Sequence, residues 1–539
     1  MNGDRAAVRS LLQKKADVNA PQADGATALQ WTAYRDDLEL ADLLISAGAN
    51  PKMANREGAT AMQLASLRGS APMIEKLLNG GAEVNERGTH GETPLMFAAR
   101  NGNLQALTLL LKRGAEINAK ESLRGTTALM WAVEQKHVEA VNLLIQQGAD
   151  VGVASSPDSK GGTAYLAPSV EQRAKQEDFI RERRKLVAPD AVVSEADAAA
   201  LAAAFGIGQN TKGGGLTSLV LAAREDCIEC AQLLIAAHAD VNQTTRYGWT
   251  ALLTAVQNRH YRLAAYLMDH GADPNIANNG GWTPLYIAVD NRNIEGGDYP
   301  VRQPDMDHLD FIKLLVSRGA NVNARICGVE STPQQCKGDS TETRTIFTMQ
   351  WLYEDGATPF LRAAQSGDTS VMKLLLEHGA SPNVATTNGD TALMVASGIG
   401  WVDGVTFEWS EAENLEAVKM CLDLGIDPNV VDSDGRTALH GAAHKGRNEV
   451  VRLLVDHGAK LDARDNGSRD TFTGALQGHT WMPIDYARGL VRVGVQSATA
   501  RPETEALLRK LMQERGIGVP SPSGTSICIT DICKGTSPQ

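Results

Sequence analysis

The chain has 539 residues, which is too long for one ordinary hydrophobic core, so several domains or a repeat array that grows by stacking are expected. Its 52 Lys and Arg residues against 64 Asp and Glu give a formal net charge of −12, which argues against nucleic acid or an anionic membrane surface as the partner. No apolar run approaches the roughly 18 residues that span a bilayer, so no membrane insertion is expected.

An internal repeat organises most of the chain. Threonines that precede an apolar helical pattern recur with successive gaps of 33, 33, 34, 90, 33, 33, 75, 33 and 46 residues, so the base period is 33. A regular period of this length predicts a stacked repeat array. These threonines are Thr27, Thr60, Thr93, Thr127, Thr217, Thr250, Thr283, Thr358, Thr391 and Thr437.

Each repeat predicts the same pair of helices. In "GETPLMFAARNG" a glycine suits a tight turn, Thr93 can cap a helix, and a proline fits its first position. The following "LQALTLLLKRG" has leucines at helical spacing and stops at Gly114, which suits a left-handed helix end. A hairpin, "AEINA", leads to the next repeat.

This pattern resembles the ankyrin repeat, and the best single match is "DSDGRTALHGAAHKGRNEVVRLLVDHGAKLDA" at residues 432–463. The resemblance covers about four fifths of the chain and implies an all-α ankyrin-repeat solenoid of about eleven stacked helix-turn-helix units with β-hairpin connections and insertions. "DRAAVRSLLQKKADVNA" at residues 4–20 fits a second helix with its hairpin, so the chain is expected to begin in mid-repeat, as an N-terminally truncated member of a bacterial-type multi-repeat family.

Departures from the period divide the chain into four segments. We predict N-terminal repeats at 1–151, a flexible and partly helical insertion at 152–213, C-terminal repeats at 214–516 and a tail at 517–539. Shorter insertions fall near 290–308, 325–354 and 398–413, and the stack is expected to continue past them. They are interpreted either as tolerated surface loops or as walls of a binding groove.

The tryptophans avoid the repeated core positions, where Leu, Val and Ala already fill the pattern. Rigid aromatic side chains at variable positions are typical of a protein-binding surface, although some of them are expected to pack against a neighbouring hairpin. In the fold that the resemblance implies, the position four residues after the capping Thr points into the concave groove. The predicted partner-binding residues are Trp31, Phe97, Trp131, Arg246, Tyr247, Trp249, Trp282, Tyr299, Trp401 and Trp409.

The chain contains no phosphate-binding loop, nucleophile elbow or zinc-protease motif, so we expect no enzyme, no cofactor and no metal. His440 and His444 in "HGAAH" are four residues apart but lack a Glu, which favours a structural role. The alternative is an enzyme or small-molecule binder with a site built by the insertions. Its polar candidates are Asp298, Tyr299, Arg302, Asp305, Asp307, His308 and Glu408.

The cysteines fall into two groups. Cys230 and Cys421 occupy apolar helix positions and are interpreted as core thiols; Cys227, three residues before Cys230, makes "CIEC" a weak candidate for redox or metal chemistry. The loop cysteines could form two local disulfides, or together a zinc site, and disulfides would favour a periplasmic or secreted protein over a cytoplasmic one. These disulfide candidates are Cys327 with Cys336 and Cys528 with Cys533.

The expected function is a non-enzymatic interaction module or scaffold that binds a partner protein through a concave groove. The partner's identity does not follow from the fold.

Overall fold

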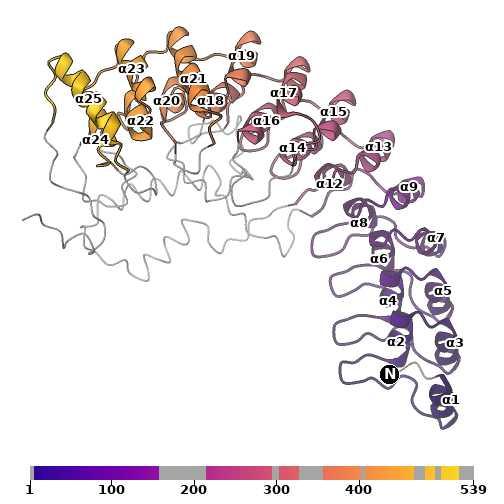
Figure 1. Ribbon diagram of the computed structural model, residues 1–539. Helices are drawn as coiled ribbons and strands as arrows, with labels where there is room; N and C mark the ends of the chain where they lie inside the picture. Colours follow the sequence, from indigo (N-terminus) through magenta and orange to yellow (C-terminus); the bar gives the residue numbers. More distant parts are fainter. Residues whose placement is uncertain are drawn as a thin grey trace, which may run out of the picture. The chain divides into compact units, whose positions relative to one another are not determined.

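The computed structural model describes residues 5–156, 214–293, 303–326, 356–401, 407–466, 480–491 and 499–520. Within these ranges it has 23 helices and, in place of strands, two isolated β-bridges. Helix α1 (Arg5–Gln13) stands alone, and the other 22 helices form eleven successive pairs (Figure 1). The predicted all-α solenoid of about eleven units is therefore confirmed.

In each pair a first helix is followed by an antiparallel second helix. The first helices are α2 (Ala28–Arg35), α4 (Ala61–Arg68), α6 (Pro94–Arg100), α8 (Ala128–Glu134), α12 (Ser218–Glu225), α14 (Ala251–Gln257), α16 (Pro284–Arg292), α18 (Pro359–Gln365), α20 (Ala392–Ser397), α22 (Ala438–Lys445) and α24 (Pro483–Ala487). The second helices are α3 (Leu38–Ser46), α5 (Ala71–Asn79), α7 (Leu104–Lys112), α9 (Val138–Gln146), α13 (Ile228–Ala236), α15 (Tyr261–Asp269), α17 (His308–Ser317), α19 (Thr369–Glu377), α21 (Glu411–Asp423), α23 (Asn448–Asp456) and α25 (Pro502–Glu514).

Local chemistry sets the ends of these helices. The hydroxyl of Thr27 accepts a hydrogen bond from the backbone N–H of Gln30, and the Gln30 side chain accepts one from the N–H of Thr27, so two free donors at the start of α2 are satisfied. At the other end of a pair, Gly114 follows α7 with a φ of 89°, a left-handed conformation that glycine adopts without strain.

A recurrent asparagine joins several of the hairpins to the next helix pair. The side-chain amide of Asn85 donates to the carbonyl of Gly114 over 3.0 Å, and its oxygen accepts from the N–H of Glu116 over 2.8 Å. Asn323 makes the same bond to the carbonyl of Gly379 over 2.9 Å, although residues 327–355 intervene in the sequence. The stack therefore continues across this insertion, as the repeat phase predicts.

The stack also continues across the segment predicted as an insertion at 152–213. The N–H of Ser155 donates to the carbonyl of Leu216 over 2.8 Å, so one hairpin is closed by residues from both sides of the segment. Helix α8 packs against α12, and α9 against α13.

The contacts divide the described residues into two compact units. We call residues 5–156 with 214–273 the N-terminal unit, and the described residues from Pro274 onward the C-terminal unit. The first two helix pairs after the predicted insertion thus belong with the pairs that precede it.

Candidate functional site

Four first helices of the N-terminal unit, α2, α4, α6 and α8, expose one side. In α2, the side chains of Leu29, Gln30, Thr32 and Ala33 are buried. On the opposite side of the helix, side chains that follow one another at a spacing of three or four residues stay accessible. Tyr34 is 50 % exposed. The same positions of α4, α6 and α8 continue the strip. We call it the first-helix face, and it consists of Trp31, Tyr34, Arg35, Leu64, Leu67, Arg68, Phe97, Arg100 and Trp131.

Rings and guanidinium groups alternate along this face. The guanidinium carbon of Arg35 lies 5.9 Å from the ring centre of Trp31. That of Arg68, on α4, lies 5.7 Å from the ring centre of Tyr34 on α2. Trp31 and Tyr34 meet edge to face, with ring centres 6.0 Å apart. The negative face of an aromatic ring attracts a cation that lies over it. These contacts therefore hold the exposed side chains in defined positions.

The strip continues onto α6 and α8. Phe97 and Trp131 pack edge to face with centres 5.8 Å apart, and the guanidinium carbon of Arg100 lies 6.0 Å from the Trp131 ring. The indole N–H of Trp131 donates to the Thr126 hydroxyl over 2.8 Å. Three of the predicted binding residues, Trp31, Phe97 and Trp131, therefore lie on one half-exposed face.

An ion-pair cluster follows on α8 and α12. Arg224 binds Glu134 over 2.8 Å and Glu225 over 2.7 Å, and all three side chains are partly exposed. Both carboxylates at this end of the face thus share one cation.

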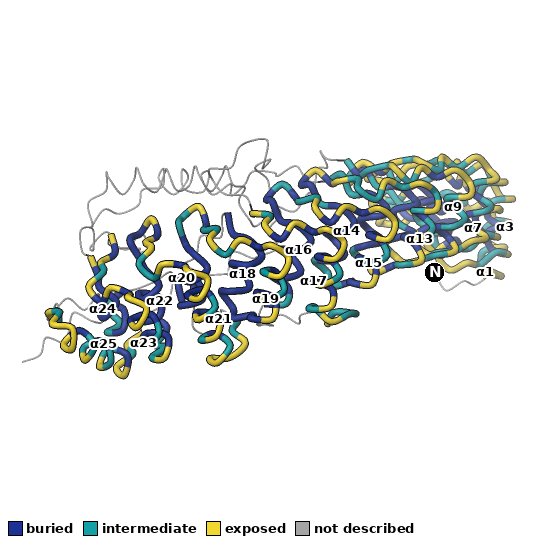
Figure 2. Tube along the Cα trace, turned by 90° about the horizontal axis from the view of Figure 1, so that it is seen from above, coloured by how far each residue is buried: buried dark blue, intermediate teal, exposed yellow. Residues whose placement is uncertain are grey.

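The equivalent positions of the C-terminal unit are buried. Ile287 on α16 and Val395 on α20 are each 1 % exposed, and Arg362 on α18 is 3 % exposed. Every residue of α18, α20 and α22 is buried (Figure 2). The face that is open along α2, α4, α6 and α8 is therefore inaccessible along these helices.

Buried ion pairs fill this closed layer. The Arg362 guanidinium donates to the Asp290 carboxylate over 2.6 Å, to the carbonyl of Asn293 over 2.7 Å and to the Ser366 hydroxyl over 3.0 Å. Beside it, Arg292 binds Asp368 over 2.8 Å. A charge in such a place is tolerated because it is paired and hydrogen-bonded.

Two predicted binding residues belong to this layer. The indole N–H of Trp409 donates to the Asn293 side chain over 2.9 Å, and Arg292 stacks over the Trp409 ring at 4.4 Å, so the segment before α21 is fastened to α16. Trp409 is nevertheless 38 % exposed. Trp401 is half-buried, with Lys445 and Arg501 each within 6 Å of its ring centre.

The remaining predicted binding residues are scattered. Trp282 is 2 % exposed and packs edge to face on Tyr286, so it offers almost no accessible surface. Tyr247 is also buried, while Trp249 is half-buried and Arg246 exposed. Tyr299 lies outside the described residues.

The polar residues of the alternative site do not gather into one site in the part of the chain that the structure describes. Asp307 accepts hydrogen bonds from the N–H groups of Leu309 and Asp310, so it caps α17. Glu408 pairs with Lys445 and Arg447. Asp305 and His308 lie beside the Asp307 cap, while Asp298 and Arg302 fall outside the described residues.

His440 has a structural role. Its Nδ1 accepts the N–H of Thr437 over 3.0 Å, and its other ring nitrogen lies 3.3 Å from the carbonyl of Trp481. Burial lowers the pKa of His440 to about 4, against the raising effect of the bond to Trp481. The neutral ring thus serves as a helix cap. Within the described ranges, no group of three or more His, Cys, Asp or Glu side chains could hold a metal ion.

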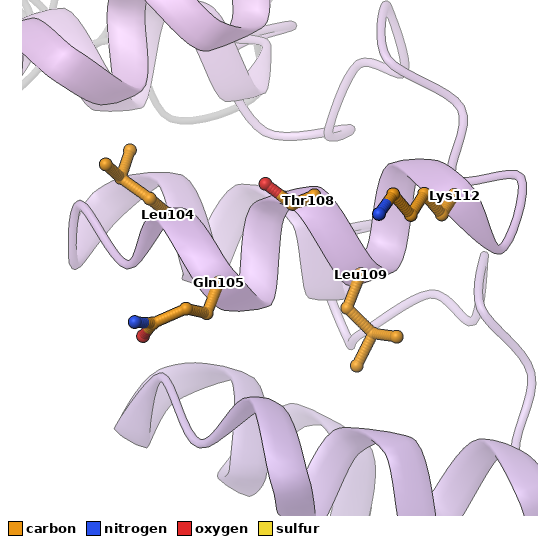
Figure 3. Close-up of a pocket in the computed structure, with 5 residues that line it drawn as sticks. All are labelled: Leu104, Gln105, Thr108, Leu109 and Lys112. Carbon is orange, nitrogen blue, oxygen red and sulfur yellow. The ribbon is translucent and has the colours of Figure 1, made fainter.

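A shallow hollow lies on the outer side of α7. It has a volume of about 340 Å³ and is lined by Leu104, Gln105, Thr108, Leu109 and Lys112 (Figure 3). All of these side chains come from one helix, so the hollow does not enclose a ligand.

Cys227 and Cys230 form a disulfide with an S–S distance of 2.03 Å. The interpretation of Cys230 as a core thiol is therefore wrong. Cys227 is the residue before α13, and the helical turn brings its sulfur beside Cys230, which the spacing alone left undecided. Cys421 is a buried free thiol, as predicted. Cys327, Cys336, Cys528 and Cys533 lie outside the described residues.

Sequence reasoning missed the partners of the aromatic residues. Tyr34, Arg35, Leu67, Arg68 and Arg100 follow the capping threonines by seven or eight positions, one helical turn after the position of Trp31 and Phe97. This spacing could have been used to predict them from the sequence, because residues at these positions lie on the same side of each first helix.

Comparison with known proteins agrees with this architecture. A family model described as ankyrin repeats in three copies matches residues 1–88, 85–155, 219–326, 337–407 and 409–482. The chain belongs to the ankyrin repeat family, whose members are generally protein–protein interaction modules. Among solved structures, the crystal structure of the human ASB11 ankyrin repeat domain is similar, with 18 % identity and a TM-score of 0.37 over 55 % of this chain and 99 % of that one.

None of the helices in the described ranges has both the length and the apolar character needed to cross a membrane.

Proposed function

We propose that this protein is a non-enzymatic interaction module whose first-helix face binds a partner protein. The observation that carries the proposal is the continuous, partly exposed strip of aromatic and arginine side chains across α2, α4, α6 and α8. Tyr, Trp and Arg are the residue types that most often dominate the energetics of protein interfaces.

The contrast between α2, α4, α6 and α8 and the later first helices supports this location. Equivalent first-helix positions are buried in α18, α20 and α22. The N-terminal unit instead leaves Tyr34 50 % and Leu67 45 % exposed. Exposed apolar side chains that are grouped on one face, rather than scattered singly, are typical of an interaction surface. Arg246 and Trp249, in the same unit, would extend the surface toward the hairpins.

The test is quantitative affinity capture from an extract of the source cells, with the full chain as bait. Replacing Tyr34 and Leu67 together by Ala removes exposed apolar surface without opening the core. We expect recovery of the specific partner to fall at least about tenfold, which corresponds to about 1.4 kcal/mol. The matched control replaces Leu104 and Val431, which are also exposed but lie outside this face. Equal recovery with both double variants would contradict the proposed site.

We also propose that the protein functions in an oxidising compartment, periplasmic or secreted. The disulfide between Cys227 and Cys230 supports this, because structural disulfides persist mainly outside the reducing cytoplasm.

The redox state is measurable on one tryptic peptide. Cleavage after Arg224 and Arg246 releases a peptide that contains both Cys227 and Cys230. When protein from its native compartment is denatured and alkylated without reduction, we expect this peptide to be unlabelled and lighter by two hydrogens than the reduced form. After reduction it should take up two labels. The buried thiol of Cys421 serves as the internal control, since it should be labelled in both samples. Labelling of Cys227 and Cys230 without reduction would leave the cytoplasm as the location.

A further inference from the structure

Buried charged side chains join two neighbouring hairpins of the C-terminal unit, which lead into α20 and α22 (Figure 1). In the first, the N–H of Thr386 donates to the carbonyl of Asp390 over 3.0 Å; in the second, the N–H of Asp432 donates to the carbonyl of Arg436 over 3.0 Å. Asp390 and Arg436 therefore occupy the same position, immediately before the capping threonine of their helix. We call residues 386–390 and 432–436 the hairpin joint.

Asp390 is buried in the joint with incomplete bonding. Its side chain is fully inaccessible, and one oxygen accepts hydrogen bonds from the Thr386 hydroxyl over 2.9 Å and the Asn388 amide over 3.2 Å. In the part of the chain that the structure describes, the other oxygen has no hydrogen-bond partner. Arg325, the cation of the preceding hairpin, donates to two backbone carbonyls instead. A buried carboxylate is usually paired with a cation or fully hydrogen-bonded, so the charged form of Asp390 is disfavoured here.

Arg436 relieves this only in part, because it is bound to other carboxylates. Its buried guanidinium binds Asp432 over 2.7 Å and Asp434 over 2.7 Å. The cation that faces Asp390 therefore already has two carboxylate partners, and Asp432 also acts on Asp390 with a like charge. A nearby like charge disfavours the ionised form of an acid.

These effects make Asp390 sensitive to pH near neutrality. Burial raises the pKa of Asp390 to about 7; the Arg436 charge opposes this rise, and the Asp432 charge adds to it. An unfolded Asp has a pKa of about 4. The contribution of Asp390 to the stability of the joint is therefore fully present below about pH 4 and is lost as the pH rises through about 7.

The groups that α22, α24 and the next hairpin place near Arg436 do not follow the same course. Burial lowers the pKa of His440 to about 4, so its ring stays neutral at higher pH. Burial raises the pKa of Tyr486 well above 10, so its hydroxyl stays protonated and donates to Asp465 over 2.6 Å. The change of charge expected between about pH 5.5 and about pH 8 is thus that of Asp390.

Direct contacts hold the two hairpins together while Asp390 is neutral. The N–H of Ser433 donates to the carbonyl of Asn388 over 2.8 Å, and the Ser433 hydroxyl donates to the Asn388 side chain. A charged Asp390 between the hairpins is more stable in water than in this layer, so its ionisation favours their separation.

We propose that the hairpin joint is a pH-sensitive element of the fold, whose two hairpins pack together while Asp390 is protonated and separate locally when Asp390 loses its proton. This device belongs to the C-terminal unit and does not depend on the proposed interaction face.

The test is hydrogen–deuterium exchange of the full chain, measured by mass spectrometry and corrected for the intrinsic pH dependence of amide exchange. Peptides that cover the hairpin joint are compared with a peptide that contains Gly356 and Ala357. Ala357 occupies the position of Asp390 in its own repeat, and its carbonyl accepts the N–H of Ile326 over 3.0 Å. From about pH 5.5 to about pH 8, we expect protection of the joint to fall at least about tenfold and that of the control peptide less than about twofold.

Asp390→Asn keeps the shape of the side chain but cannot ionise, so protection of the joint should vary less than about twofold over this pH range. Asp390→Ala is the second variant, because alanine fills this position at Ala26, Ala59 and Ala357. The matched control, Asp462→Asn, removes a carboxylate from an exposed position of the next hairpin and should retain the wild-type fall. Far-UV circular dichroism checks that each variant is folded.

Protection of the joint that does not fall with pH in the wild type, or that falls equally in the control peptide, would overturn the proposal. A pH dependence that persists in a folded Asp390 variant, or that disappears equally in Asp462→Asn, would overturn it as well. The wild-type comparison with the control peptide decides the matter even if neither Asp390 variant folds.

Discussion

Arg362→Met is expected to lower the free energy of unfolding of the C-terminal unit by about 3 to 5 kcal/mol. Arg362 and Asp290 form a 2.6 Å ion pair in which both side chains are less than 5 % exposed. Met fills a similar volume but removes the cation that pairs with the buried Asp290 carboxylate. Urea unfolding measures the total loss. Hydrogen exchange of the α18 amides shows whether it is local, because long repeat arrays do not always unfold in one step.

Two further variants make the interpretation specific. Arg113→Met breaks the exposed pair with Glu75 and should cost less than about 1 kcal/mol. Asp290→Asn combined with Arg362→Met should cost less than Arg362→Met alone, because the buried carboxylate that loses the Arg362 cation is then neutral as well. If Arg362→Met were no more harmful than Arg113→Met, the buried pair would not stabilise the closed layer.

Glu86→Gln is expected to stabilise the N-terminal unit at about pH 8 by on the order of 1 to 3 kcal/mol, and to have little effect near pH 4. Burial raises the pKa of Glu86 from 4.5 to about 7; the hydrogen bond from the Thr60 hydroxyl opposes this rise, and the nearby Glu83 charge adds to it. The wild-type fold therefore favours the protonated carboxyl. Its contribution to stability is fully present below about pH 4.5 and is lost as the pH rises through about 7.

Urea titrations of both proteins across this pH range provide the measurement. The difference between the two proteins isolates Glu86, because other titrating groups are common to both. Asp390 is one such group: burial raises its pKa to about 7 as well, against the lowering effect of Arg436. A stability difference that does not vary with pH would show that Glu86 remains charged in the fold.

Much of the fold follows from short stretches of sequence. Thr27 caps α2 and Gly114 ends the α7 turn because these residues satisfy backbone groups a few positions away. An asparagine that joins a hairpin to the next pair recurs in several repeats at the same position, so stacking order is also readable from the chain. This is why the helix pairs were predicted correctly even where insertions interrupt the period.

Only part of the candidate site could be predicted from the sequence. Trp31, Phe97 and Trp131 were selected because large aromatic residues stand out at a repeated position, whereas Tyr34 and the arginines over the rings, which share their face, were not selected. Trp282 and Trp409 were selected by the same aromatic signal. In the structure Trp282 is buried and Trp409 fastens a loop to α16. Residue type alone does not distinguish a surface anchor from a packing residue.

The sequence by itself determined where helices begin and end, how they pair and in which order the pairs stack, because capping and helical periodicity act over a few residues. Only the tertiary structure decided which first-helix positions are open. Trp131 and Arg362 occupy the same position in their repeats, yet one is half-exposed and the other is buried against Asp290. Exposure depends on groups distant in the chain, such as Trp409 at Asn293, and a 33-residue pattern contains no information about those contacts.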